Sequence, residues 1–166
     1  MGVKAIHDAD LVHLDIKPEN ILLVGGKAKI ADFGIGRYCS KMFAKNPEQL
    51  LRRGVGTPEY MSPEQFRAAR PKDIKKTSDI YSLGIVLFEI LDGGRPFVGD
   101  PLELQDAHLN IQPSLLTGKV ETWWSIVKRC LEKEATDRYL NIDQLLRDLD
   151  YVAQGLPLSV DVACPN

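Results

Sequence analysis

Cysteine is scarce in this 166-residue sequence, and long apolar runs are absent. The three cysteines, Cys39, Cys130 and Cys164, lie far apart, so they form neither a metal-binding spacing nor a disulfide framework. The longest apolar run, 83–91, is too short to span a bilayer and includes Glu89. The N-terminus lacks the basic and then apolar segments of a signal peptide. These absences predict a cytoplasmic protein in a reducing compartment, with no membrane segment in this chain.

A strong charge of one sign is also lacking. The formal net charge is −2, whereas a nucleic-acid-binding domain is usually basic, so we expect no nucleic acid among the partners. Hydrophobic residues make up 44% of the chain and charged residues 27%, which are ordinary values for a globular protein. There is no internal repeat or low-complexity segment. The length suits one domain with a substantial core.

Four polar residues stand at fixed spacing in the first part of the chain. Asp15 is a carboxylate able to accept a proton from a hydroxyl group, and Lys17 is a cation that can meet a phosphate. Asn20 and Asp32 supply oxygen atoms of the kind that Mg²⁺ prefers. A base, a cation and two metal ligands together favour metal-assisted phosphoryl transfer.

Two short strands and a tight turn separate the two candidate metal ligands. Segments 21–24 and 27–31 read as strands, and Gly25-Gly26 between them is typical of a hairpin turn, because glycine tolerates positive φ. An antiparallel hairpin brings its two outer ends together. We therefore expect Asn20 and Asp32 at the same end of the hairpin.

Three motifs in order resemble those of a known family. H-L-D-I-K-P-E-N at 13–20 and D-F-G at 32–34 resemble the catalytic loop and metal-binding motif of eukaryotic-type (Hanks-type) serine/threonine protein kinases. G-V-G-T-P-E-Y-M-S-P-E at 54–64 resembles the end of the kinase activation segment, and several phrases are most similar to the bacterial branch. The resemblance covers about 3–153. It predicts the C-terminal lobe, a mainly α fold in which a helical bundle surrounds a buried central helix and a small β-hairpin carries the catalytic loop and D-F-G.

The resemblance also implies a role for individual residues. Asp15 would orient and deprotonate the substrate hydroxyl, Lys17 would neutralise charge on the γ-phosphate of ATP, and Thr57 would bond to both. Asn20 and Asp32 would hold Mg²⁺ and the nucleotide. Leu22 would lie in the ATP site. The five residues with implied structural roles are His13, which would pack near Phe33, Glu64, which would pair with Arg138, and Asp79, which would bond to the catalytic-loop backbone.

Three of these positions have a second interpretation. His13 is either a base or ligand, or a packed histidine that holds the loop. Asp79 is either a catalytic acid or a scaffold residue, and Trp123-Trp124 is either a ligand cage or part of the core. We favour the structural interpretation in each case.

Hydrophobic periodicity predicts further helices. Segment 79–91 is apolar nearly all round, which is typical of a buried helix. Thr77 or Ser78 would cap its start, and Gly93-Gly94 would end it. Other helices are expected at 3–9, 101–108, 122–133 and 142–152, with a short helix around 47–51 and a tail after residue 157.

Three kinase motifs have no counterpart in the sequence: the glycine-rich phosphate loop, the strand lysine and its glutamate partner. We expect 1–156 to be a C-terminal lobe, 157–166 to be a tail, and an amino-terminal lobe to be supplied in cis or in trans. With that lobe, the expected activity is transfer of the ATP γ-phosphoryl to Ser or Thr of a protein substrate. Alone, the chain is expected to be inactive. The alternative is a lone lobe that serves as a pseudokinase-like protein-binding module.

Leu14 stands where the family most often has an arginine that pairs with a phosphate on the activation segment. Residues 41–53 contain no Ser, Thr or Tyr, so both the cation and the acceptor hydroxyl of such a switch are missing. We expect no activation by phosphorylation within 41–53.

Overall fold

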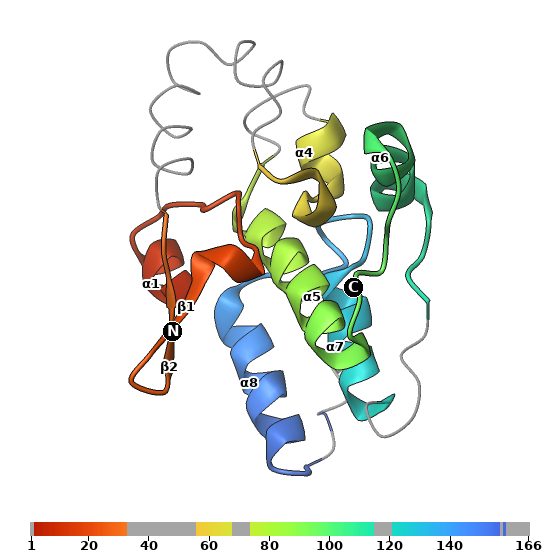
Figure 1. Cartoon of the computed structure of the whole chain (residues 1–166). Helices are drawn as coiled ribbons and strands as arrows, with labels where there is room; N and C mark the ends of the chain where they lie inside the picture. Colours follow the sequence, from red (N-terminus) through yellow and green to blue (C-terminus); the bar gives the residue numbers. More distant parts are fainter. Residues whose placement is uncertain (1, 33–55, 68–73, 115–120, 157, 159–166) are drawn as a thin grey trace, which may run out of the picture.

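The structure is a computed structural model that describes residues 2–32, 56–67, 74–114, 121–156 and 158. Figure 1 shows the long helix α5 through the middle, with α4 and α6 at the top right and α1 and the hairpin on the left. The mainly α fold with one small hairpin, predicted from the sequence, is confirmed. The elements are α1 (Gly2–Asp8), η1 (Pro18–Asn20), β1 (Ile21–Val24), β2 (Lys27–Ile30), η2 (Pro58–Tyr60), α4 (Pro63–Arg67), α5 (Lys76–Asp92), α6 (Pro101–Asn110), α7 (Glu121–Cys130) and α8 (Ile142–Ala153).

Helix α5 is the central buried element. Ile80, Tyr81 and Ile85 have no exposed surface. At Gly84 a Cβ atom would lie 2.6 Å from Cβ of Cys130 on α7, so glycine lets the two helices approach closely. The helix ends as expected, with Gly93 in the left-handed conformation at φ 82°.

Two details of α5 differ from the sequence prediction. The helix begins at Lys76, so Thr77 and Ser78 lie inside its first turn instead of capping it. Ser78 still serves the start of the helix, because its Oγ accepts a bond from the Lys75 backbone N–H at 3.4 Å. The last turn is not buried on all sides, since Ile90 is 71% exposed. No helix in the described ranges is both long and apolar enough to cross a bilayer.

Helix α7 packs against both α5 and α8, and α8 also contacts α1. Helix α7 ends at Cys130, three residues before the predicted end, whereas α8 begins at the predicted residue and ends one residue later than predicted. Trp123 and Trp124 are half-buried and pack against the core, which agrees with their interpretation as core residues. Leu158, in the segment predicted as a tail, also packs against the core.

Helix α6 carries a buried histidine within an aromatic cluster. The helix begins with a capping box. The Asp100 side chain accepts bonds from Leu102 N and Glu103 N, and the Glu103 carboxylate accepts a bond from Asp100 N. His108 has no exposed surface. Its Nδ1 lies 2.9 Å from the Tyr81 hydroxyl, and its ring contacts the rings of Phe66 and Phe97 at 5.4 and 5.0 Å between centroids.

This buried histidine should make folding pH-dependent. Burial, and then the positive charge of Lys133, lower the pKa of His108 from 6.5 to about 4. As the pH falls below 6.5, the unfolded chain takes up a proton that the folded chain rejects, so stability is lost between pH 6.5 and 4, by as much as about 3 kcal/mol. The free energy of unfolding, measured by urea titration, should therefore decline over this range in the parent and decline less in His108→Gln. Equal declines in the two proteins would contradict the assignment.

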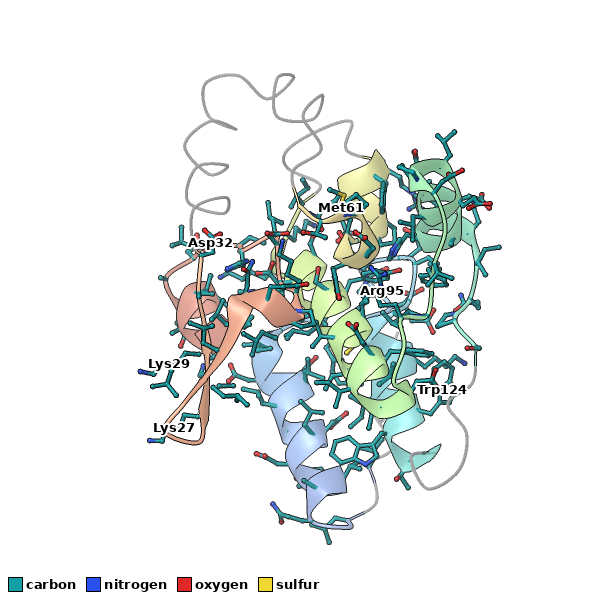
Figure 2. All side chains as sticks on the ribbon, in the orientation of Figure 1. Lys27, Lys29, Asp32, Met61, Arg95 and Trp124 are labelled. Carbon is teal, nitrogen blue, oxygen red and sulfur yellow. The ribbon has the colours of Figure 1, made fainter. Side chains whose placement is uncertain are left out.

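The β-hairpin forms as predicted, one residue shorter at its end. Strands β1 and β2 are antiparallel, with Ile21 opposite Ile30 and Val24 opposite Lys27. Gly25 and Gly26 have φ of 57° and 71°, as a two-residue type I′ turn requires. Lys27 and Lys29 point away from the body of the molecule (Figure 2). At the opposite end Ala31 N donates to Asn20 O at 2.8 Å, so this end of the hairpin is closed.

Candidate active site

The catalytic loop and the residue after Gly56 meet in a compact polar cluster. The Thr57 hydroxyl donates to Oδ1 of Asp15 at 2.8 Å, and Nζ of Lys17 donates to the same hydroxyl oxygen at 2.7 Å. Nζ of Lys17 lies 3.4 Å from Oδ2 of Asp15. Because these residues are 40 and 42 positions apart in sequence, the cluster forms only when the chain folds. The structure thus brings together the three residues that were predicted to be catalytic.

Asn20 orients the carboxylate of Asp15 from the other side. Its Nδ2 donates to the Asp15 backbone carbonyl at 2.8 Å and lies 3.3 Å from Oδ2 of Asp15. Asn20 is 7% exposed and Asp15 is 6% exposed. With its amide nitrogen turned toward Asp15, the amide oxygen is the atom of Asn20 that would meet a cation.

Asp79, at the start of α5, fixes the backbone of the catalytic loop. Its Oδ2 accepts a bond from His13 N at 2.8 Å and its Oδ1 accepts one from Leu14 N at 2.8 Å. Nε2 of His7 lies 2.9 Å from Oδ2 of the same carboxylate. Asp79 has no exposed surface. A fully buried carboxylate with both oxygens bonded to neighbouring groups is typical of a scaffold residue, so these contacts favour the structural interpretation of Asp79.

His13 is a packed residue and not a base exposed to substrate. It is 1% exposed. The Asp15 backbone N–H lies 3.3 Å from Nδ1 of His13, and a backbone N–H can only donate, so Nε2 carries the proton. Nε2 lies 3.2 Å from the carbonyl oxygen of Ala31, to which it donates this proton. His13 therefore links the catalytic loop to the end of the hairpin. The predicted contact with Phe33 lies outside the described residues.

The second candidate metal ligand, Asp32, lies at the same end of the hairpin as Asn20, since the preceding residue Ala31 bonds to Asn20. Figure 2 shows Asp32 at the end of the hairpin that lies away from Lys27. Asp32 is exposed, with a φ of 59°, a left-handed conformation that is uncommon outside glycine but that aspartate adopts more readily than most residues. Within the described ranges no three His, Cys, Asp or Glu residues gather as a metal site. One amide and one carboxylate oxygen nevertheless fit Mg²⁺, which takes one or two protein ligands and completes its shell with waters and phosphates.

Glu64 and Arg138 join α4 to the loop before α8. Nη1 and Nη2 of Arg138 donate to Oε1 and Oε2 of Glu64, both at 2.8 Å. The Arg138 side chain has no exposed surface and that of Glu64 is 12% exposed. Arg138 also donates to three backbone carbonyls, those of Thr77, Glu132 and Lys133. The predicted pair is therefore a bidentate, largely buried ion pair.

Sequence reasoning missed two residues that support the catalytic loop, Gln65 by direct contact and His7 through Asp79. His7 lies on the buried face of α1 and contacts Asp79. The sequence feature that could have identified it is its position four residues after Val3, which puts a polar residue on the apolar face of the helix. Gln65 directly follows Glu64, the last residue of the third motif, and contacts Leu14. Leu22, predicted to contact the nucleotide, lies on β1 and is 49% exposed.

Comparisons with known proteins agree with this geometry. Residues 1–149 match the protein kinase domain family. The chain is 36% identical to a serine/threonine-protein kinase, drp72, of Corynebacterium efficiens over 93% of this chain and 29% of that protein. It is 44% identical to PknA of Corynebacterium glutamicum over 68% of this chain and 23% of that protein. It is 33% identical to the serine/threonine-protein kinase PknL of Mycobacterium tuberculosis over 95% of this chain and 39% of that protein.

The chain thus spans less than half the length of each of these relatives. Its match to the family nevertheless covers most of its own residues, with the motif residues clustered in the fold. The chain belongs to the protein kinase family, with bacterial serine/threonine kinases among its relatives.

Proposed function

We propose that this chain is the catalytic C-terminal lobe of a serine/threonine protein kinase, which transfers the γ-phosphoryl of ATP to a protein hydroxyl. The observation that carries the proposal is the Thr57 hydroxyl, held between Asp15 and Lys17 at 2.8 and 2.7 Å. This arrangement joins the activation segment to the proposed base and to the proposed phosphate-binding cation.

Asp15 is the proposed base and orienting group. Its Oδ1 is held by Thr57, and its Oδ2 faces Asn20 and Lys17. A substrate Ser or Thr hydroxyl that approached this carboxylate would donate its hydrogen to it and present its oxygen to the γ-phosphate. Lys17, two residues away on the same loop, would neutralise charge on the transferring group.

Asn20 and Asp32 are the proposed Mg²⁺ ligands, and Leu22 is the proposed contact with the nucleotide. Asn20 and Asp32 would hold Mg²⁺, which would supply positive charge to offset that of the ATP phosphates. The buried amide of Asn20 and the exposed carboxylate of Asp32 lie at one end of the hairpin. The protein's part would be to hold both oxygen donors at this end of the hairpin, with Asn20 bonded to Asp15.

The remaining partners follow from the kinase proposal. We assign 1–156 to the lobe and 157–166 to a tail, and an amino-terminal kinase lobe in cis or in trans would cover the nucleotide. The substrate is a protein with Ser or Thr, and the proposed location is the cytoplasm. Support for a reducing compartment comes from the scattered cysteines, of which Cys130 is free and buried.

The first test compares the 166-residue chain with the same chain joined to an amino-terminal kinase lobe, called here the two-lobed enzyme. The phosphate-covering loop and the strand lysine are required parts of the reaction. We therefore expect no measurable phosphorylation of a generic protein substrate by the chain alone and robust phosphorylation by the two-lobed enzyme.

Two outcomes would count against this proposal. Robust activity of the isolated chain would show that the second lobe is dispensable. A folded two-lobed enzyme with no activity would favour the alternative, a pseudokinase-like module that binds proteins without transferring phosphate.

A further inference from the structure

The backbone of Leu14, next to Asp15, has a conformation that side chains disfavour. Its φ is +69°, in the left-handed region where a Cβ atom crowds the chain. Leu14 is 3% exposed, and leucine has no polar side-chain group to bond its own backbone. Neighbouring groups must therefore hold this conformation. Asp79 holds one side, since its Oδ1 accepts a bond from Leu14 N at 2.8 Å.

Gln65 holds the other side. Its Nε2 donates to the Leu14 carbonyl at 3.0 Å, across 51 positions of sequence. Its Oε1 accepts bonds from the backbone N–H and the hydroxyl of Ser62, at 3.0 and 3.1 Å. A backbone N–H can only donate and a carbonyl can only accept, so the two contacts agree on one orientation of the amide. Gln65 thus ties α4 to the peptide that immediately precedes Asp15.

Gly56 gives independent support for this contact. Its φ is +114°, and a Cβ atom there would lie 2.8 Å from the Leu14 carbonyl oxygen and 3.1 Å from Nε2 of Gln65. Only glycine leaves room for the two groups to bond. Thr57 follows directly and bonds to Asp15. Segment 56–65 therefore holds the catalytic loop at two points, the Asp15 side chain and the Leu14 carbonyl.

We propose that Gln65 is a positioning residue for phosphoryl transfer: its amide fixes the Leu14–Asp15 peptide and makes an ordered segment 56–65 a condition for a competent Asp15. The inference rests on the proposed kinase function. Its physical basis is that one amide is bonded to both segments, so the loop cannot rotate about the Leu14–Asp15 peptide without breaking that bond. Because the amide and Leu14 are uncharged, this coupling requires no phosphate group.

Two variants separate the two halves of the amide. Gln65→Glu keeps an oxygen for the bonds from Ser62 but loses the donor to the Leu14 carbonyl, and Gln65→Met loses both. In the two-lobed enzyme we expect both variants to lower kcat about 10- to 100-fold, because small displacements of a reacting group cost that much. KM for ATP should stay within about twofold, because the proposed role affects the transfer step and not nucleotide binding.

Gln144→Met is the matched control. Gln144 also bonds a backbone group, since its Oε1 accepts from Leu140 N at 3.0 Å, but it lies in α8, away from the catalytic loop. We expect its kcat to equal that of the parent. A parent-like kcat in either Gln65→Glu or Gln65→Met would overturn the proposal. The proposal would also be overturned if the Gln65 variants lost kcat only in proportion to a loss of folded protein and Gln144→Met lost the same amount.

Hydrogen exchange in the 166-residue chain tests the contact without any need for activity. Amides 14–16 should exchange faster in both Gln65 variants than in the parent, and at the parent rate in Gln144→Met. Unchanged exchange in the Gln65 variants would overturn the positioning role. An inactive two-lobed parent would instead refute the proposed function, so the two failures are distinguishable.

Discussion

Asp15→Asn in the two-lobed enzyme should lower kcat by about 10²- to 10⁴-fold, which is the usual contribution of a general base. The substitution removes the ability to accept a proton, and it replaces the Oδ2 atom that faces Nδ2 of Asn20 and Nζ of Lys17 with an NH₂ group. An asparagine oxygen can still accept the bond from Thr57 that Oδ1 of Asp15 accepts at 2.8 Å. The fold should therefore survive, and the thermal melt of the variant should match that of the parent.

Asp92→Asn is a suitable control, because Asp92 is an exposed carboxylate in the last turn of α5. It should leave both kcat and the melt unchanged. Turnover of Asp15→Asn within about threefold of the parent would remove Asp15 from the proposed chemistry. A large fall in its melting temperature would show instead that Asp15 is mainly structural.

Arg138→Ala should destabilise the chain by roughly 3–5 kcal/mol, because it leaves a buried carboxylate without its partner. Burial alone would raise the pKa of Glu64, but the hydrogen bonds and charge of Arg138, with a bond from Ser78, outweigh it, so that pKa lies below its usual value. Glu64 is therefore charged in the folded chain at neutral pH. Three backbone carbonyls also lose the donors that Arg138 provides.

The exposed pair Arg67–Glu134 provides the comparison. Its N–O distance is 2.9 Å, close to that of the buried pair, but its side chains are 47% and 63% exposed. Arg67→Ala should cost no more than about 1 kcal/mol, since water replaces the lost partner. Urea unfolding of the two variants measures the difference. If Arg138→Ala unfolded at the same urea concentration as the parent, the buried pair would not stabilise the fold.

Features that depend on local sequence were the most predictable. Glycine pairs indicated the hairpin turn at Gly25-Gly26 and the end of α5 at Gly93, because glycine tolerates positive φ without help from distant contacts. Periodicity identified α8 almost to the residue. The end of α7 was predicted too late, since Leu131 is buried although it lies beyond the helix, and periodicity records burial more directly than helicity.

Contacts between distant segments were predictable only through the family resemblance. Nothing in the spacing of Thr57 and Asp15 indicates that they touch, yet they are bonded across 42 positions. Gln65 and His7 were missed for the same reason, because neither residue type signals a role without its partner. The start of α5 was misplaced because its first turn contains Thr77 and Ser78, which have lower helix propensity and are common N-cap residues. Phe33 and the helix expected around 47–51 lie outside the described residues.

The most direct test of the central claim is the chemical identity of the phosphorylated product. The two-lobed enzyme, given Mg²⁺ and ATP labelled in its γ-phosphate, is incubated with three peptides that differ only in having Ser, Thr or Tyr at the acceptor position. We expect label on the Ser and Thr peptides, none on the Tyr peptide, and label that appears at least about 100-fold more slowly with Asp15→Asn. Label on the Tyr peptide alone, or equal labelling by the parent and Asp15→Asn, would contradict it.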